Sequence, residues 1–328
     1  MLAKVSILIP TYNRAHYLRD AIQSALTQTY SNIEILVLDD ASPDDTLSVV
    51  QEFKNDSRLR YIRHTQNKGI VGNWKSGLSL ARGEYFCFLH DDDTFEPEFV
   101  ERLLEPLRQN PNLILSFSDH WVMDAFGNRS VAESEAASQA FQRHILAGGR
   151  LNDFARSALV DLSLPVGATL FRREFVAQHF LDERACGSID IYLFLQCVLS
   201  GYEAFYISER LMNYRVHEGG MSRSMPLHMA EGHIFRYKTI LSKSNLQALH
   251  DSTRTSLCTT LTYAAIVSIM SGRASDARRQ ASESWRLRPN IKALIAFMLS
   301  WTGSFAPRVL LLMRRIVHKL KACKAATH

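Results

Sequence analysis

The chain has 328 residues, 46% of them hydrophobic and 22% charged, and a formal net charge of +5. This length fits one large or two modest domains, and the composition excludes disordered and fibrous proteins. The basic charge comes from residues 284–328, which hold nine Lys/Arg and no Asp or Glu, so the remaining chain carries about −4. The five cysteines are scattered without CxxC or CxxxC spacing, which predicts buried thiols in a reducing compartment and argues against disulfides and a zinc site.

Short apolar runs alternate with amphipathic stretches in the first half of the chain. The runs of strand length are Val5–Ile9, Ile33–Leu38, Leu59–Ile62, Tyr85–Leu89 and Leu113–Phe117. The stretches with helical periodicity are Tyr17–Thr27, Thr46–Phe53, Trp74–Ala81 and Phe99–Leu107. This alternation predicts an α/β fold, in which a mostly parallel sheet is flanked by helices on both faces. Polar residues follow the N-terminal run at once, without a small-residue cleavage site, so it is interpreted as a strand and not as a signal peptide.

The pattern changes in the second half. The small, polar composition of Ser130–Ala140 predicts a loop or a mobile crossing segment. Short strands are expected to return at Gly167–Phe171, Ala204–Ile207 and Leu211–Val216. After about Met225 the strand signals end. We therefore expect an α/β domain over residues 1–225 and a C-terminal helical region over residues 226–328.

The last segment, Arg308–Lys321, has apolar residues on one helical face and basic residues on another. Such a helix suits either an anionic membrane surface or docking of its apolar face on the domain. The uncharged run Ala293–Pro307 is shorter than the roughly 20 residues that span a membrane. The basic residues lie in an apolar tail that lacks a known nucleic-acid module, so no nucleic acid is expected as a partner.

Polar residues directly follow three of the predicted strands. Tyr12 follows the first strand, Asp39 and Asp40 the second, and the triplet Asp91–Asp93 the fourth. Because ligands of open parallel sheets bind beyond the carboxyl ends of the strands, these residues predict a ligand site at one sheet edge. Neither GxGxxG nor GxxxxGK[ST] occurs in the chain, which argues against a Rossmann dinucleotide site and a P-loop.

The three adjacent carboxylates of Asp91, Asp92 and Asp93 repel one another and need a counter-charge. Mg²⁺ or Mn²⁺ suits such hard oxygen ligands, with phosphates and waters completing the shell. A solvated acidic turn is the alternative, but the position after a buried strand favours the metal. Tyr12 could stack on a planar base and Asp40 could accept a hydrogen bond from an imide N–H. A turn aromatic and a helix-capping cluster are the corresponding alternatives.

Five segments, in order and spacing, resemble the family 2 glycosyltransferases over roughly residues 4–100. They are Val5–Arg14, Glu34–Ser42, Asn67–Gly69, Ala81–Tyr85 and His90–Asp93. The resemblance implies a GT-A fold, an inverting reaction and a nucleoside-diphosphate-sugar donor, with a UDP-sugar as the expected donor.

The same resemblance implies roles for individual residues. The implied nucleotide-sugar site consists of Pro10, Thr11, Tyr12, Arg14, Asp40, Asn67, Lys68, Asp91 and Asp92. Asp91 would face the ribose or the sugar. Asp93, with Asp91 or Asp92, would bind the metal ion on the diphosphate.

The resemblance is weaker in the second half. It implies that Asp190 is the catalytic base, although Ile189 stands where the family usually has Glu. Asp190 would equally serve as the N-cap of a helix over Ile191–Leu199. The segment Tyr214–Ser222 resembles the family's Tyr-Arg-x-His element. It implies that Arg215 contacts the leaving phosphate and that His217 contacts the metal or the diphosphate, an ordinary surface histidine being the alternative.

These expectations combine into one function. The chain would transfer a sugar to a hydroxyl of a glycan or lipid-linked acceptor in cell-surface polysaccharide synthesis. We expect it in the cytoplasm, with the cytoplasmic face of the membrane as the alternative location. One alternative is a catalytically silent nucleotide- or carbohydrate-binding protein of the same fold. A nucleotidyltransferase is another, but such enzymes typically carry a Gly-rich basic loop after the first strand, which is absent here.

Overall fold

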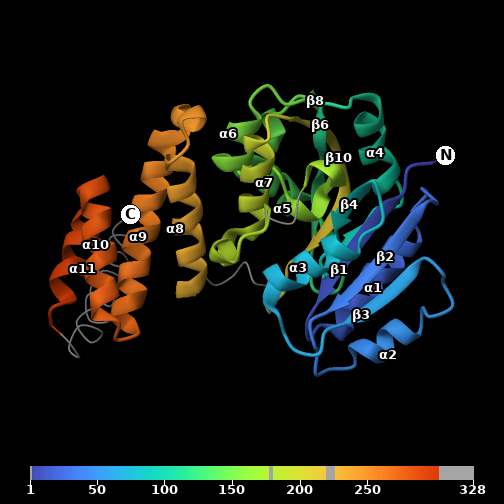
Figure 1. Ribbon diagram of the computed structural model, residues 1–328, viewed down its shortest axis with the longest axis horizontal. Coiled ribbons are helices and arrows are strands. Elements are labelled where there is room, and N and C mark those ends of the chain that lie inside the picture. Colours follow the sequence, from blue (N-terminus) through green and yellow to red (C-terminus); the bar gives the residue numbers. More distant parts are fainter. Residues whose placement is uncertain (1, 177–179, 219–225, 303–328) are drawn as a thin grey trace, which may run out of the picture. The chain divides into compact units, whose positions relative to one another are not determined.

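The computed structural model describes residues 2–176, 180–218 and 226–302. The chain divides into two compact units, Met1–Arg223 and Ser224–His328. The first unit contains a ten-stranded sheet with helices on both faces (Figure 1). Its strands are β1 (Val5–Thr11), β2 (Ile33–Asp39), β3 (Leu59–Arg63), β4 (Tyr85–Phe88), β5 (Thr94–Phe95), β6 (Leu113–Met123), β7 (Arg129–Ser130), β8 (Gly149–Arg150), β9 (Thr169–Arg172) and β10 (Glu203–Arg215). Its α-helices are α1 (Ala15–Leu26), α2 (Thr46–Gln51), α3 (Gly69–Leu80), α4 (Phe99–Gln109), α5 (Val131–Ala140), α6 (Phe154–Leu159) and α7 (Ile189–Leu199).

The strand order places several strand ends at one edge. The order is β3-β2-β1-β4-β9-β6-β10-β5, with β7 paired to β6 and β8 to β10. Strands β1 to β4 are parallel, and β9 runs antiparallel to both β4 and β6. Consequently β6 runs in the same direction as β4, and β10 is parallel to β6. The carboxyl ends of all these parallel strands therefore lie along the same edge, as the sequence predicted.

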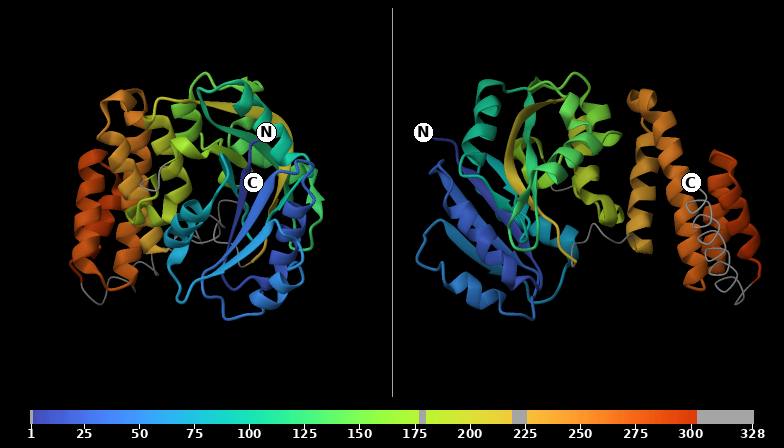
Figure 2. Two further views of the ribbon diagram at one scale, coloured as in Figure 1. Left: turned by 45° about the vertical axis from the view of Figure 1, so that its right-hand side comes forward. Right: turned by 180° about the vertical axis from the view of Figure 1, so that it is seen from behind.

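Both faces of the sheet are buried, which explains why the strands are almost continuously apolar. On one face Ile7 and Val37 belong to a core that includes Leu18 of α1 and Leu103 of α4. The opposite face is covered by α3 and α7. There, aromatic rings stack in sequence: Phe86 on Phe171 at a centroid distance of 5.0 Å, and Phe171 on Phe194 at 5.9 Å. The two views in Figure 2 show the helices on the two faces of this sheet.

The loop predicted for Ser130–Ala140 is wrong, because this segment forms α5. Ser130 caps the helix by accepting a hydrogen bond from the Glu133 N–H. Ser134 is fully buried, and its hydroxyl oxygen accepts a hydrogen bond from Val122 N–H of β6. The alanines of α5 favour the helix, and the serines that suggested a loop act as its cap and as a sheet contact.

Two other expectations need correction. The separate strands expected at Ala204–Ile207 and Leu211–Val216 are one strand, β10, whose pairing with β6 shifts register around Arg210. The N-cap of α7 is Ser188, so Asp190 lies within the first helical turn instead of capping it. The helix begins earlier than predicted because Ile189 is buried and extends its apolar face.

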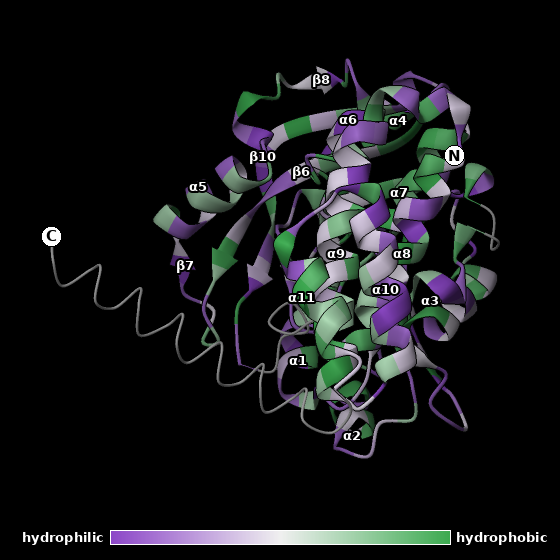
Figure 3. Cartoon of the chain, turned by 90° about the vertical axis from the view of Figure 1, so that its left-hand side faces the viewer, coloured by the Kyte–Doolittle hydropathy of each residue, from purple (hydrophilic) through white to green (hydrophobic). Residues whose placement is uncertain are grey.

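The second unit is helical throughout its described part, as predicted from the end of the strand signals. It contains α8 (Leu227–Leu241), α9 (His250–Met270), α10 (Ala274–Leu287) and α11 (Ile291–Leu299). Figure 3 shows that α11 is mostly hydrophobic, and Ala293 and Ala296 of this helix are buried. Within the described ranges, no helix combines the length and apolarity needed to cross a membrane. The predicted basic helix Arg308–Lys321 lies outside the described residues.

Candidate active site at the carboxyl edge of the sheet

The ends of β1 and β2 form one side of the candidate site. The Thr11 carbonyl accepts a hydrogen bond from Asp40 N–H at 3.0 Å, and the Asp40 carboxylate accepts one from Lys68 N–H at 2.7 Å. Asp40 is buried, whereas the Tyr12 side chain is 49% exposed. The edge therefore presents an accessible aromatic ring beside a fixed carboxylate. The Asn67 side chain accepts a hydrogen bond from the N–H of Gly69. Gly69 has a φ of +70° and is the first residue of α3.

Asp39, the other member of the pair, has a structural role. Its carboxylate accepts hydrogen bonds from Ser42 N–H at 2.8 Å and from the Tyr61 hydroxyl at 2.5 Å. Burial raises the pKa of Tyr61, as does the contact with Asp39. Sequence analysis did not single out Tyr61, because only the parallel pairing of β2 with β3 brings it beside Asp39.

The acidic triplet at the end of β4 is neutralised in part by Arg14. The Arg14 guanidinium lies 3.2 Å from an Asp91 oxygen and 2.5 Å from an Asp92 oxygen. Burial raises the pKa of Asp91 to about 6, against the opposing effect of Arg14. A residue of the loop after β1 thus supplies part of the counter-charge that the triplet needs.

Asp93 is the most deeply buried carboxylate of the triplet, with an exposed fraction of 1%. Its carboxylate accepts a hydrogen bond from Arg215 N–H at 2.9 Å and lies 3.2 Å from His90 Nδ1. Burial opposes a charge on His90, but the contact with Asp93 outweighs it and raises the pKa of His90 to about 9. His90 immediately precedes the triplet in the sequence, and this adjacency is the signal from which the pairing could have been predicted.

His217 and Arg215 approach the triplet from the end of β10. His217 Nε2 lies 3.1 Å from an Asp92 oxygen. The Arg215 guanidinium is buried and donates to the Asp92 carbonyl at 2.8 Å and to Asp20 at 3.0 Å. It also lies over the Tyr17 ring. Arg215 therefore fixes the turn that carries the carboxylates. Its ion pair with Asp20 could not be predicted from the sequence, because the two residues are far apart in the chain.

The carboxylates and histidines at this edge are oxygen and nitrogen ligands of the kind that divalent metals bind. In the described part of the chain, no three His, Cys, Asp or Glu side chains converge as a metal cluster, so Asp91, Asp93 and His217 do not form a ready-made triad. Asp92 and His217 do converge. Mg²⁺ and Mn²⁺ bound through substrate phosphates commonly take only one or two protein ligands. The site therefore fits a cation that arrives with a diphosphate.

Asp190 lies in the first turn of α7, on the face of the sheet covered by α3 and α7. It is partly exposed, and its carboxylate has no hydrogen-bond or ion-pair partner among the described residues. On the same face Trp74 stacks on Phe88 at 4.0 Å and lies 6.4 Å from the His90 ring. The Ser188 hydroxyl and the Trp74 indole N–H are buried without a partner in the described ranges. A polar substrate on this face would satisfy such groups.

Comparison with known proteins decides the family. The sequence model of the family described as "Glycosyl transferase family 2" matches residues 6–178, which are more than half of the chain. The chain belongs to glycosyl transferase family 2. Chondroitin synthase from Escherichia coli is 38% identical over 125 residues, which cover 38% of this chain and 18% of that protein. The chain thus aligns with less than a fifth of the length of this relative.

Solved structures confirm the fold of this family 2 chain. S. aureus TarS, determined with UDP-GlcNAc, superposes with a TM-score of 0.62 over 90% of this chain and 79% of that chain, at 18% identity. A mannosyltransferase from Pyrobaculum calidifontis, determined with GDP-Man and Mn²⁺, gives a TM-score of 0.56 over 91% and 87% of the two chains, at 16% identity. The predicted GT-A fold with its C-terminal helical region is therefore confirmed.

Proposed function

We propose that this chain is an inverting glycosyltransferase that transfers a sugar from a nucleoside-diphosphate donor, with UDP as the expected nucleotide, to a hydroxyl group. The observation that carries the proposal is the convergence of three strand ends. They bring the exposed Tyr12 ring, the fixed Asp40 carboxylate and the Asp91–Asp93 triplet to one edge. The complex of TarS with UDP-GlcNAc supports a UDP-sugar donor.

In this proposal the base stacks on Tyr12 and its imide N–H donates to Asp40. Pro10, Thr11, Asn67 and Lys68 surround the base and ribose. Asp91 faces the ribose or the sugar, and Arg14 shifts from the carboxylates toward the phosphates.

The proposal includes a Mn²⁺ or Mg²⁺ ion carried by the diphosphate and held by His217 with carboxylates of the triplet. When bound, the ion would stabilise the negative charge that develops on the departing diphosphate. The Mn²⁺ complex of the Pyrobaculum mannosyltransferase supports this assignment. Arg215 acts behind the triplet, where it keeps Asp92 and Asp93 oriented.

Asp190 is the proposed catalytic base. It removes the proton of the acceptor hydroxyl, whose oxygen bonds to the anomeric carbon as the bond from that carbon to the phosphate oxygen breaks. The nucleoside diphosphate leaves with the bonding electrons, and a single displacement inverts the configuration.

The acceptor is proposed to be a glycan or a lipid-linked glycan of a cell-surface polysaccharide, built in the cytoplasm. Membrane attachment would use Arg308–Lys321, outside the described residues. The second candidate function is a silent nucleotide-binding protein of the same fold. It is favoured by one observation: Ile189 occupies the position where an acidic neighbour of the base is usual.

A thermal-shift experiment tests the donor site. Nucleoside diphosphates are added with and without Mn²⁺ to the full chain, to the double variant Asp91→Ala/Asp93→Ala, and to the control Glu174→Gln, which alters an exposed carboxylate. Ligands that bind the native state raise the melting temperature. We expect metal-dependent stabilisation by UDP in wild type and control, and its loss in the double variant. Release of UDP from a UDP-sugar then separates the enzyme from the silent protein. Stabilisation by no nucleotide would contradict the proposal.

A further inference from the structure

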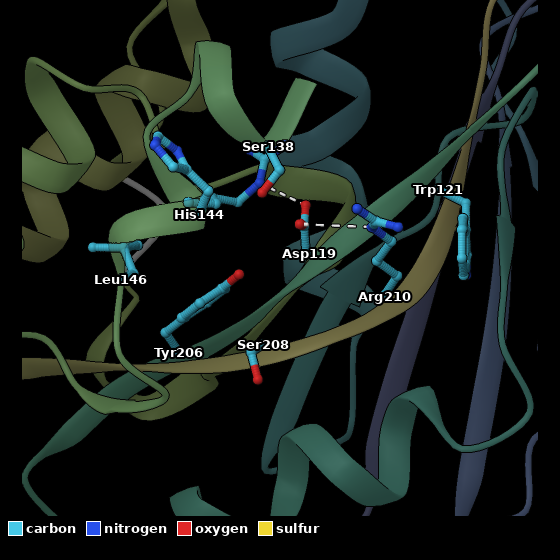
Figure 4. A pocket seen from close by; sticks show the side chains of 9 residues that line it. Asp119, Trp121, Ser138, His144, Leu146, Tyr206, Ser208 and Arg210 are labelled. Atoms are coloured by element: carbon cyan, nitrogen blue, oxygen red, sulfur yellow. Dashed lines mark hydrogen bonds and ion pairs between the residues drawn. The ribbon is translucent and has the colours of Figure 1, made fainter. Parts of the chain in front are cut away.

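A cavity of about 430 Å³ lies away from the acidic triplet, between β6, β10, α5 and the 3-10 turn Arg143–Ile145 (Figure 4). We propose that this cavity binds an anionic unit of the acceptor glycan, a sugar carrying a carboxylate or a phosphate. This inference rests on the proposed glycosyltransferase function and deepens it by naming the chemical class of the acceptor.

The charges that line the cavity favour an anion. Arg143 donates to Asp119 through Nε at 2.6 Å, and Arg210 Nε lies 3.9 Å from the other Asp119 oxygen. Two guanidinium groups thus share one carboxylate, and among the described residues Asp119 is the sole acidic one in the lining. The arrangement leaves one positive charge at the cavity, carried by partly buried side chains whose attraction for an anion is less screened than that of a fully exposed pair. The exposed His144 stands at the same cavity.

Arg210 is the guanidinium that a ligand can reach. The Arg143 side chain is 1% exposed, and its remaining nitrogens contact the Ser163 carbonyl at 3.2 Å and His120 Nδ1 at 3.4 Å. The Arg210 side chain is 21% exposed and lies over the Trp121 ring at 4.7 Å. Trp121 therefore orients Arg210 while Arg143 holds Asp119.

The cavity lining contributes the hydroxyl groups of Tyr206 and Ser138. Tyr206 is only 2% exposed, and its hydroxyl points into the cavity without a hydrogen-bond partner among the described residues (Figure 4). Ser138, 7% exposed, likewise lacks a partner for its hydroxyl in the described part of the chain. Both hydroxyls line the cavity and are therefore available to hydrogen-bond the oxygen atoms of a ligand. Burial raises the pKa of Tyr206 to about 12, which keeps it a donor at neutral pH.

The cavity is near enough to the candidate active site to hold another part of the same acceptor. Met123 pairs with Arg215, whose N–H binds Asp93. Trp121 and Asp119 precede Met123 by two and four residues in β6. At about 3.3 Å per residue, they lie roughly 7 and 13 Å along the strand from that pairing. A glycan whose reacting hydroxyl is at the sheet edge could therefore place a neighbouring unit in the cavity.

Direct binding of small probes tests this proposal. Calorimetry on the full chain compares trigalacturonic acid, glycerol 3-phosphate and the neutral maltotriose. The variants are Arg210→Gln and Tyr206→Phe, with Arg279→Gln as a control for loss of an exposed arginine outside this unit. We expect an acidic probe to bind wild type and control at least about tenfold more tightly than maltotriose. Arg210→Gln should lose about tenfold in affinity, the effect of one charge-assisted hydrogen bond. Tyr206→Phe should weaken binding less while leaving the melting temperature near wild type.

Binding of the carboxylate probe or of the phosphate probe alone identifies the anionic group. Equal binding of maltotriose, no binding of either acidic probe, or binding unchanged in both cavity variants would overturn the inference. UDP-dependent stabilisation is measured on the same samples. If UDP stabilises every variant while the acidic probes fail, only the acceptor inference fails. If acidic probes bind but no nucleotide does, the proposed function fails and the cavity is an anion site of another kind.

Discussion

The backbone N–H of Arg215 donates a hydrogen bond to the Asp93 carboxylate at 2.9 Å, although the two residues are 122 positions apart in the chain. The Arg215 side chain reinforces this link by donating to the Asp92 carbonyl. The end of β10 thereby holds the turn after β4, so the carboxylates of the candidate site are positioned by a strand that follows them much later in sequence.

Replacement of this arginine should destabilise the protein as well as the site. We expect Arg215→Met to lower the free energy of unfolding by about 2–3 kcal/mol, because buried hydrogen bonds of a charged group are lost. Urea denaturation measures the effect. Arg19→Met, which alters an exposed arginine paired with Glu52, should change stability by less than about 1 kcal/mol. Equal effects of the two substitutions would show that Arg215 does not anchor the triplet.

Tyr12 should contribute to nucleotide binding and little to folding, since its ring is half exposed. Base–aromatic stacking contributes about 1–3 kcal/mol. Tyr12→Ala should therefore weaken UDP binding about tenfold, while Tyr12→Phe retains it. Titration calorimetry with UDP and Mn²⁺ provides the measurement, and equal affinity of the alanine variant would remove Tyr12 from the nucleotide site.

Arg14 competes with a metal ion for Asp91 and Asp92. In Arg14→Met the triplet loses its protein cation, so Mn²⁺ should bind the nucleotide-free protein about tenfold more tightly, a change of about 1.4 kcal/mol. Electron paramagnetic resonance of free Mn²⁺ measures the affinity, with Arg19→Met as the matched control. Weaker Mn²⁺ binding in Arg14→Met would contradict the competition.

Asp190→Asn should reduce turnover by a factor of at least about 10² while leaving UDP-dependent stabilisation intact, because general bases typically contribute 10²–10⁴. The carboxylate has no protein partner in the described ranges, so the substitution should leave the fold unchanged. Rates are measured at saturating donor concentration. Turnover near the wild-type value would assign the base to another residue.

His120 should make stability dependent on acid pH. Burial lowers the pKa of His120 to about 4, and the Arg143 charge acts in the same direction. The folded-state pKa is below the unfolded value of about 6.5, so the contribution is present above pH 6.5 and is lost as pH falls toward 4. The loss should be on the order of 2–3 kcal/mol.

Urea denaturation between pH 4 and 7 checks this prediction by comparing wild type with His120→Asn and with the exposed control His144→Gln. The His120 variant should show a flatter pH dependence than the other two proteins. Parallel curves for all three would exclude His120 as the titrating group.

The sequence predicted those parts of the fold whose signals are local. Runs such as Val5–Ile9 and Ile33–Leu38 are buried on both faces and are strands in the structure, and the polar residues after them lie at the predicted edge. Helix α5 was missed because serine is ambiguous: it disfavours helix interiors yet favours caps, and only the tertiary contact of Ser134 with β6 resolves the choice.

The electrostatics of the site were less predictable, because they depend on long-range pairings. The triplet indicated a need for positive charge, but the sequence did not indicate that Arg14 supplies it from 77 residues away. The cavity is a further case, since Asp119, Arg143 and Arg210 come from three separate segments. These three cavity residues form no motif in the sequence.

Strand β9 runs against both of its neighbours and joins them, with Leu170 opposite Cys87 of β4 and Phe171 opposite Leu115 of β6. Strand β9 therefore lies at the boundary between β1, β2 and β4, which end at the proposed nucleotide site, and β6 and β10, which line the proposed acceptor cavity. We expect that a chimaera keeping β9 could exchange the cavity segments for those of another family member, and so change the acceptor without rebuilding the nucleotide half of the sheet.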